Sequence, residues 1–135
     1  MLLRMSTSKT EYIPGVCNIN HAEIAKRRMI GHIGFAVFVI LLLVFISTST
    51  SLYLRVLLFI PAFMTFSGYG QARQKFCTGY AAAGKQNASK DSKIASVITD
   101  KDALMADKRK GRQMNLRAFV LAIITVAIAL IIPRR

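Results

Sequence analysis

Long uncharged runs separated by polar and charged stretches dominate the pattern of this chain. Residues 29–54, 56–72 and 118–133 contain no Asp, Glu, Lys or Arg. Each run is about as long as one bilayer crossing, since roughly 20 helical residues, or about 17 at the short limit, span a hydrocarbon core of about 30 Å. A helix of a soluble bundle would show a polar stripe at the 3.6-residue period, and GFAVFVILLLVFI has none. We therefore predict an all-α membrane protein.

The first two runs predict a transmembrane helical hairpin. We expect its spans at 29–46 and 52–70. The sequence Ser47-Thr48-Ser49-Thr50-Ser51 between them is too short for anything but an antiparallel turn. Every backbone polar group inside the bilayer must be satisfied within the protein, which favours helices for both spans.

The last run predicts a third, C-terminal hydrophobic helix, near 116–132, in a segment covering 116–135. At about 1.5 Å per residue this helix only just crosses the bilayer before Pro133-Arg134-Arg135. A full crossing and a re-entrant helix are therefore both open.

The chain ahead of the third helix divides into three parts. Residues 1–19 are expected to form a cytoplasmic N-terminal tail, and 20–87 the two-helix hairpin domain. The sequence Asn20-His21-Ala22-Glu23 has the form of a capping box, so the first helix is expected to begin there, with Glu23 reaching back to Asn20. Residues 88–115 form a basic linker, either an amphipathic helix on the membrane surface or a solvated chain.

Charge sets the expected orientation. The 135 residues include 19 Lys and Arg against 6 Asp and Glu, a formal charge of +13, although 53% of the residues are apolar. Most of the basic residues lie in 1–28 and 71–117, and basic loops stay on the cytoplasmic side. We expect the N-terminus and 71–117 in the cytoplasm and 47–51 outside.

The basic residues beside the spans are expected to contact anionic lipid headgroups rather than nucleic acid. Arg55, one turn into the second span, is expected to extend its side chain to the outer headgroups. The expected headgroup contacts are Lys26, Arg27, Arg28, Arg55, Lys108, Arg109, Lys110 and Arg112.

Small residues follow one face of the third hydrophobic helix. Ala118, Ala122, Thr125 and Ala129 are spaced i, i+4, i+7 and i+11. Such a face lets helices approach closely in lipid, so it predicts packing against the hairpin or a second copy. The alternative is that alanine is simply common in membrane spans.

Cys17 and Cys77 are the only cysteines, and each lies just outside the hairpin on the expected cytoplasmic side. Since the cytosol keeps thiols reduced, we expect a reactive pair or two inert thiols rather than a disulfide. Arg73 and Lys75 would favour a thiolate at Cys77.

Other chemistry has little support in the sequence. There is no compact Cys and His spacing for a metal, no glycine-rich phosphate loop and no Ser-His-Asp set. Six acidic residues leave little for acid-base catalysis. We expect no metal, no cofactor and no enzymatic activity.

Two short motifs resemble the YgaP-like inner-membrane two-helix transmembrane domain family, a hairpin found alone or fused to rhodanese-type modules. Ahead of the first span, Asn18, Glu23, Arg27 and Gly31 fall at the family's intervals. After the second span, Cys77, Tyr80 and Gly84 match Cys-x-x-Tyr-x-x-x-Gly. The similarity covers about residues 17–87.

The chain departs from the family's pattern at two positions, where it has Ile24 and Thr78. The family usually has Arg directly after the acidic residue and Pro directly after the cysteine. The third hydrophobic segment is a further departure.

The resemblance implies a bacterial cytoplasmic (inner) membrane hairpin that anchors and self-associates. Independently of the resemblance, the pair of Glu23 and Arg27 is expected on physical grounds to fix the first helix against the chain around Tyr80. Gly31 and Gly84 would allow close approach there. The fused members' catalytic cysteine belongs to the rhodanese module, so its role does not transfer to Cys77.

These observations favour a small non-catalytic membrane protein, acting as an anchor, an oligomerisation module or an accessory part of a larger assembly. The alternative is a thiol or sulfur-transfer protein that uses Cys77, with or without Cys17. A third possibility is an oligomeric pore or small-ion carrier, although no expected span contains an acidic residue.

Overall fold

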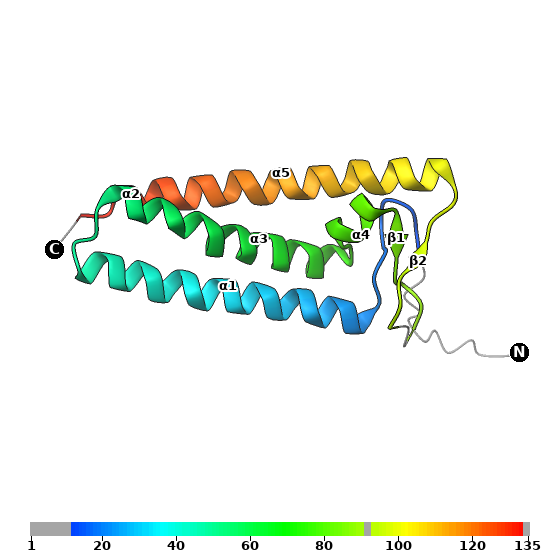
Figure 1. Cartoon of the computed structure of the whole chain (residues 1–135), viewed down its shortest axis with the longest axis horizontal. Coiled ribbons are helices and arrows are strands. Elements are labelled where there is room, and N and C mark those ends of the chain that lie inside the picture. The colour runs from blue at the N-terminus through cyan, green and yellow to red at the C-terminus, as the bar shows by residue number, and fades with distance from the viewer. Residues whose placement is uncertain (1–11, 91–92, 134–135) are drawn as a thin grey trace, which may run out of the picture.

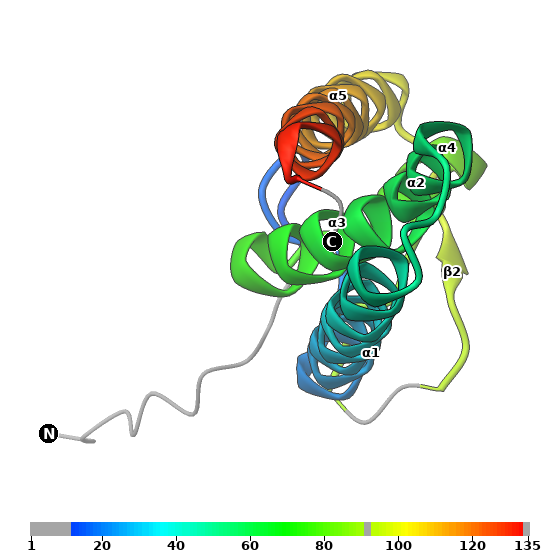
Figure 2. The same cartoon turned by 90° about the vertical axis from the view of Figure 1, so that its left-hand side faces the viewer.

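Three long helices lie side by side in the computed structural model, which describes residues 12–90 and 93–133 (Figure 1). They are α1 (His21–Ser47), α3 (Phe59–Gln74) and α5 (Lys101–Ile131), with α3 between the other two (Figure 2). Helix α1, the 52–74 segment that includes α3, and α5 are each long and apolar enough to cross a membrane. The prediction of an all-α membrane protein is confirmed.

The hairpin turns immediately after Ser47, and the second arm begins at Leu52. This arm consists of α2 (Leu52–Arg55), a 3-10 turn (Val56–Leu58) and α3. The 3-10 turn comes just before Pro61, which has no backbone N–H and whose ring conflicts with regular α-helix in the preceding turn.

Helix α1 begins at the expected place, because the Asn20 side chain accepts a hydrogen bond from Glu23 N at 3.0 Å. The reciprocal half of the predicted capping box is wrong. The Asn20 backbone N–H donates instead to the Asn87 carbonyl at 2.8 Å. The Glu23 carboxylate turns to Lys26 and Arg27.

Glycines bring α1 and α3 into backbone contact. A Cβ added to Gly68 would lie 2.5 Å from Gly31 N, and one added to Gly34 would lie 2.8 Å from Thr65 N. No side chain fits at these distances, so these glycines allow the close approach that stabilises helix pairs in lipid.

The chain reverses at the end of α3 through Lys75, which adopts a left-handed conformation with φ 54°. Phe76 N then donates to Gln71 O at 3.1 Å, as in a Schellman ending. The short helix α4 (Thr78–Ala83) begins after this reversal. It ends at Gly84, which adopts a left-handed conformation with φ +71°.

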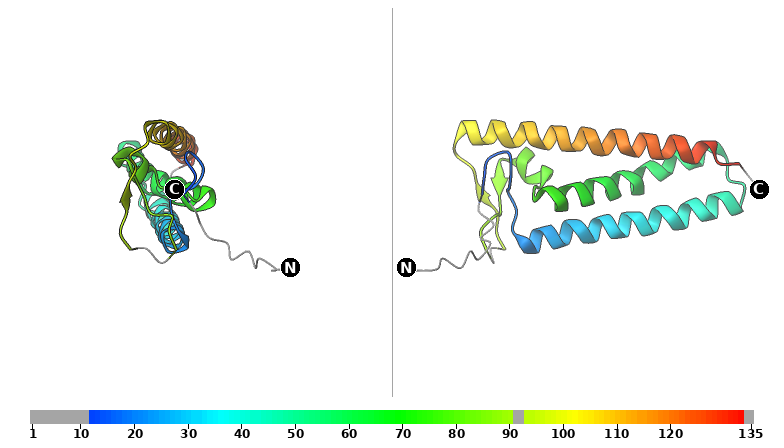
Figure 3. Two further views of the ribbon diagram at one scale, coloured as in Figure 1. Left: turned by 90° about the vertical axis from the view of Figure 1, so that its right-hand side faces the viewer. Right: turned by 180° about the vertical axis from the view of Figure 1, so that it is seen from behind.

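A small cap of loops and two short strands covers one end of the bundle (Figures 1 and 3). Strands β1 (Lys85–Gln86) and β2 (Ser96–Val97) pair antiparallel, with Lys85 opposite Val97. The segment before α1 joins this cap through a parallel bridge between Ile19 and Asn87. The turn between α1 and α2 and the end of α5 lie at the opposite end.

In the structure one helix, α5, runs across the expected boundary between linker and third helix at 115 and 116. The helix is continuous from Lys101, where Asp100 caps it, to Ile131. Of the 88–115 segment, which was expected as an amphipathic helix or a solvated chain, the part from Lys101 on is helical, whereas Val97 is in β2 and 70% exposed. One stripe of buried residues runs along the whole of α5, and it comprises Ala103, Asp107, Gly111, Met114, Ala118, Ala122, Val126 and Ala129. Because this stripe keeps one helical register, the polar and apolar halves fold as a single helix.

Candidate functional site

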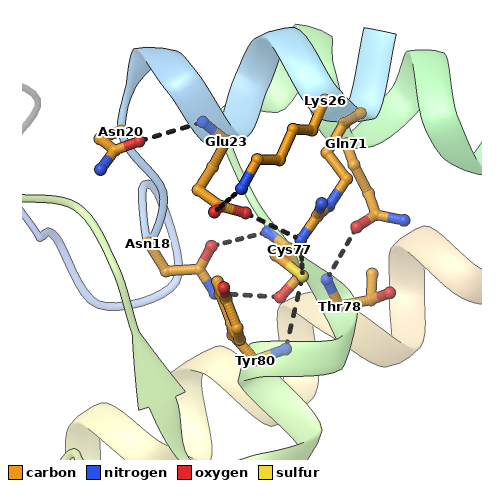
Figure 4. Close-up of polar contacts among 9 residues, drawn as sticks. Asn18, Asn20, Glu23, Lys26, Gln71, Cys77, Thr78 and Tyr80 are labelled. Atoms are coloured by element: carbon orange, nitrogen blue, oxygen red, sulfur yellow. Dashed lines mark hydrogen bonds and ion pairs between the residues drawn. The ribbon is translucent and has the colours of Figure 1, made fainter. Parts of the chain in front are cut away.

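A buried polar cluster at the capped end connects the chain before α1 with the junction of α3 and α4 (Figure 4). We call it the Cys77 cluster, and it comprises Asn18, Asn20, Glu23, Lys26, Arg27, Gln71, Cys77, Thr78 and Tyr80.

Asn18 is fully buried and binds the backbone of Cys77 with both ends of its side-chain amide. Nδ2 donates to the Cys77 carbonyl at 3.0 Å, and Oδ1 accepts from Cys77 N at 2.6 Å. The Asn18 backbone N–H also donates to Lys75 O at 3.2 Å. One residue therefore satisfies the backbone on both sides of the reversal after α3.

The Cys77 thiol accepts two hydrogen bonds from its own chain. Arg27 Nη2 donates to Sγ at 3.1 Å, and the Tyr80 backbone N–H donates at 3.5 Å. Cys77 is only 5% exposed. In this structure the thiol acts as the N-cap of α4 and as an acceptor for the guanidinium.

Charge in the cluster is paired. Glu23, 5% exposed, forms an ion pair with Arg27 Nη2 through Oε2 at 3.3 Å and accepts a hydrogen bond from Lys26 Nζ with Oε1 at 3.0 Å. The Arg27 guanidinium lies 5.9 Å from the centre of the Tyr80 ring, within cation–π range. This pairing matters because an isolated buried carboxylate or guanidinium would be strongly destabilising.

The structure brings together five of the residues named from the sequence: Asn18, Glu23, Arg27, Cys77 and Tyr80. Gly31 lies elsewhere, where an added Cβ would be 2.6 Å from the Tyr69 ring. Gly84 ends α4, and its carbonyl accepts from Ile98 N at 2.9 Å.

Cys17 is buried, and its thiol points to Ile19 O at 3.6 Å. Both cysteines are free thiols. Across residues 12–90 and 93–133, no group of three or more His, Cys, Asp and Glu side chains is placed to hold a metal ion.

Arg55 does not reach the headgroups, which corrects that expectation. Its side chain is fully buried, and Nη1 donates to the carbonyls of Ala129 at 3.1 Å and Ile132 at 2.8 Å. The last carbonyls of a helix lack intrahelical donors and carry the negative end of the helix dipole. Arg55 therefore caps α5, while its Nε and Nη2 find no hydrogen-bond partner within the described part of the chain.

Arg27 is also unsuited to headgroup contact, because its side chain is 16% exposed and engaged by Glu23 and Cys77. The other residues expected to contact headgroups keep surface positions. Lys26, Arg28, Lys108, Arg109 and Arg112 are exposed, and Lys110 is half-buried.

The small-residue face of the third helix turns inward for most of its length. Ala118, Ala122 and Ala129 are buried, and Ala129 packs in an apolar cluster with Leu58 and Val126. Thr125 is only partly buried, and its hydroxyl donates back to Leu121 O at 2.8 Å.

Sequence reasoning missed a second buried polar contact, at Asp107. Its Oδ1 accepts from Gly15 N at 2.7 Å, and its Oδ2 accepts from the Tyr12 hydroxyl at 2.9 Å. Burial, and then the hydrogen bond and charge of Asp107 with the charge of Asp100, raise the pKa of the Tyr12 phenol. The signal was the spacing of Ala103, Asp107 and Gly111 by four residues, which places an acidic residue on the buried stripe.

Comparison of the chain with protein-family models, curated proteins and solved structures gave no match. The resemblance to the YgaP-like domain therefore stays a hypothesis based on its two short motifs.

Proposed function

We propose that this protein is a non-catalytic integral membrane module of the bacterial cytoplasmic membrane. In this proposal it serves as an anchor or accessory part of a larger assembly, containing further copies or other membrane proteins. The observation that carries the proposal is the Cys77 cluster, whose buried groups bind one another. The Asn18 amide, the Glu23 carboxylate and the Cys77 thiol all have partners in their own chain.

The function of the cluster, on this proposal, is mechanical. It joins the segment before α1 to the reversal after α3, two places 59 residues apart in the sequence. A hairpin in lipid gains little from apolar burial, so glycine contacts and satisfied polar groups must fix its two arms. The cluster would hold the cytoplasmic ends of these arms in one arrangement for a partner.

The charge pattern supports the proposed orientation. The cluster and the exposed Lys26, Arg28 and Lys108 belong to the segments that the basic-residue bias assigns to the cytoplasm. A membrane-impermeant amine reagent applied to intact spheroplasts and to inverted vesicles tests this assignment. Labelling of these lysines only in inverted vesicles is expected, and labelling from outside would reverse the orientation.

Native mass spectrometry of the protein extracted from its own membrane tests the accessory role. We expect a complex of fixed stoichiometry, with a second copy or with another membrane protein. Asn18→Ala, which removes both amide contacts with Cys77, is expected to reduce that complex. Ser89→Ala, at an exposed site in the same cap, is the matched control. A partner-free monomer under all gentle extraction conditions would contradict the role.

A second candidate function is sulfur transfer by Cys77, favoured by the 3.1 Å contact between Arg27 Nη2 and Sγ. A neighbouring guanidinium stabilises a thiolate. The thiolate would attack the terminal sulfur of a persulfide donor R–S–SH. The new bond joins Sγ to that sulfur, the donor S–S bond breaks, and its electron pair leaves with the thiolate R–S⁻.

Cys77→Ser separates the two candidates. Serine is a good N-cap and can still accept from Tyr80 N and Arg27, so assembly should survive under the structural proposal. Sulfur transfer requires that a persulfide donor add one sulfur atom, reversibly with reductant, to the wild type and to Cys17→Ser but not to Cys77→Ser. Absence of this mass gain in the wild type would exclude the second candidate.

A further inference from the structure

A cleft of about 540 Å³ opens between the second half of α3 and the middle of α5. Its apolar walls include Phe66 and Gly70 from α3 and Ala118 and Leu121 from α5. Polar side chains line the rest of it, among them Arg73, Gln74, Asn115 and Arg117. The cleft adjoins the Cys77 cluster, because Gln71 and Thr78 belong to both.

The polarity of the cleft changes along the bundle axis. Helices α3 and α5 run in opposite directions beside each other (Figures 1 and 3). Phe66 and Leu121 therefore line the part of the cleft that is farther from the capped end of the bundle. Arg73 directly follows the uncharged run 56–72, and Arg117 directly precedes the uncharged run 118–133. Two guanidinium groups from different helices are therefore placed where apolar helix surface gives way to polar surface, the level of lipid headgroups.

No acidic side chain of the described residues forms an ion pair with either of these two cations. Both residues are exposed, and within residues 12–90 and 93–133 neither side chain has an ion pair or a hydrogen bond. Arginine binds phosphate oxygens in bidentate fashion, and its charge attracts anionic headgroups. The neighbouring amides of Gln74 and Asn115 supply further donors.

Gly70 leaves the apolar part of the cleft open. A Cβ added at Gly70 would meet nothing within 4 Å, although Gly31, Gly34 and Gly68 on the same bundle are tightly enclosed. Close helix packing therefore does not account for this glycine. Its missing side chain leaves open the apolar part of the cleft beside Phe66, which we call the apolar channel and which is suited to a hydrocarbon chain.

We propose that this cleft binds one anionic glycerophospholipid, with its phosphate between Arg73 and Arg117 and an acyl chain over Phe66, Gly70 and Leu121. The lipid comes from whichever leaflet faces the capped end of the bundle, so the inference does not depend on the orientation or on the accessory role. A soluble phosphate compound would use the arginines but not the apolar channel.

The test is lipid titration of the detergent-solubilised, delipidated protein, followed by native mass spectrometry. The probes are phosphatidylglycerol, phosphatidylcholine with the same acyl chains, and glycerol 3-phosphate. We expect one tight site for phosphatidylglycerol and much weaker binding of the other two. Equal affinity for both lipids, or for glycerol 3-phosphate and phosphatidylglycerol, would overturn the proposal.

Two variants locate the site. Each arginine near an anionic headgroup contributes about fivefold to affinity, so Arg73→Gln with Arg117→Gln should weaken phosphatidylglycerol binding roughly 25-fold. Arg28→Gln with Arg109→Gln removes the same charge from exposed positions outside the cleft and should change it little. Similar losses in both pairs would indicate non-specific attraction and overturn the site.

Gly70→Leu tests the apolar channel without removing charge. A Cβ at this position meets no atom within 4 Å, and the rest of the leucine side chain is expected to enter the cleft, so phosphatidylglycerol binding should fall at least tenfold while the melting temperature holds or rises. Unchanged lipid affinity in this folded variant would contradict placement of an acyl chain beside Gly70.

Discussion

The side chain of Asn18 forms two hydrogen bonds with the backbone of Cys77, 59 residues further along the chain, and both residues are buried. Through this contact the chain before α1 completes the backbone hydrogen bonding of the reversal after α3. Asn87, 2% exposed, lies close by, but its side-chain Nδ2 and Oδ1 have no partner among the described residues. Both side chains are almost fully buried, but of the two only that of Asn18 has hydrogen-bond partners among the described residues.

Asn18→Ala is therefore expected to lower the free energy of unfolding by about 2–4 kcal/mol, because two hydrogen bonds are lost and the buried Cys77 N–H is left without a partner, whereas the Cys77 carbonyl keeps the one from Ala81 N. Asn87→Ala, the matched control, should cost at most about 1 kcal/mol because it breaks no side-chain bond. Denaturant titration in detergent micelles measures both values. Equal losses would show that the amide contacts of Asn18 have no special role.

The ion pair of the cluster supports a second prediction. Glu23→Ala leaves Arg27 without its carboxylate in a mostly buried place, so the melting temperature in detergent should fall clearly. Lys26→Ala removes a contact of the same carboxylate by a side chain that is 67% exposed, and should change stability by less than about 1 kcal/mol. If Glu23→Ala melts like the wild type, the pair does not fix α1.

Close packing of α1 against α3 predicts opposite effects at two glycines of one helix. Gly68→Ala would place a Cβ within 2.5–2.9 Å of the α1 backbone and must push the helices apart, lowering stability by at least about 2 kcal/mol. Gly70→Ala meets open space and should raise stability by about 0.5–1 kcal/mol, as alanine favours helix. Unfolding titrations of both variants check the pair, and the same sign at both sites would refute the packing.

Much of this fold could be predicted because a helix that spans a lipid bilayer has a distinctive sequence pattern. Uncharged runs with no polar stripe indicate spanning helices, and Asn20 marks the first residue of α1 through a local hydrogen bond. The continuity of α5 across residues 115 and 116 was not expected, because the composition changes sharply near Arg117 although the helical register does not. The continuous stripe from Ala103 through Gly111 to Ala129 held that information.

The cluster could be anticipated only in part. The motif spacing named Asn18, Glu23, Arg27, Cys77 and Tyr80, but the partner of each polar atom depends on tertiary contacts. Arg55 shows the difficulty, because an arginine near the end of an isolated span would extend to the headgroups. Here the last turn of α5 lies beside it and offers carbonyl acceptors that no local pattern reveals.

That contact predicts the behaviour of an Arg55→Met variant. Methionine fills similar space but donates no hydrogen bond to the carbonyls of Ala129 and Ile132, so the last turn of α5 should fray. Amide hydrogen exchange should rise in 127–132 and stay unchanged in 103–114. Because removing a buried charge offsets part of the loss, global stability should change less than this local exchange. If amide exchange at 127–132 were the same in the variant and in the wild type, Arg55 would not cap α5.

Tyr12 and Asp107 predict a dependence of stability on alkaline pH. The pKa of the Tyr12 phenol is raised in the folded protein above the ordinary value of about 10, chiefly by burial and by Asp107. A raised folded pKa means that the contribution is complete below about pH 10 and is lost as the pH rises toward the folded value. The Tyr12→Phe variant lacks both the titration and the 2.9 Å hydrogen bond, so it should be about 1 kcal/mol less stable at pH 7. Unfolding titrations from pH 7 to above pH 10 should show this difference shrinking, because the other titrating groups cancel between the two proteins. A difference that stayed constant over this range would mean that Asp107 does not hold the neutral phenol.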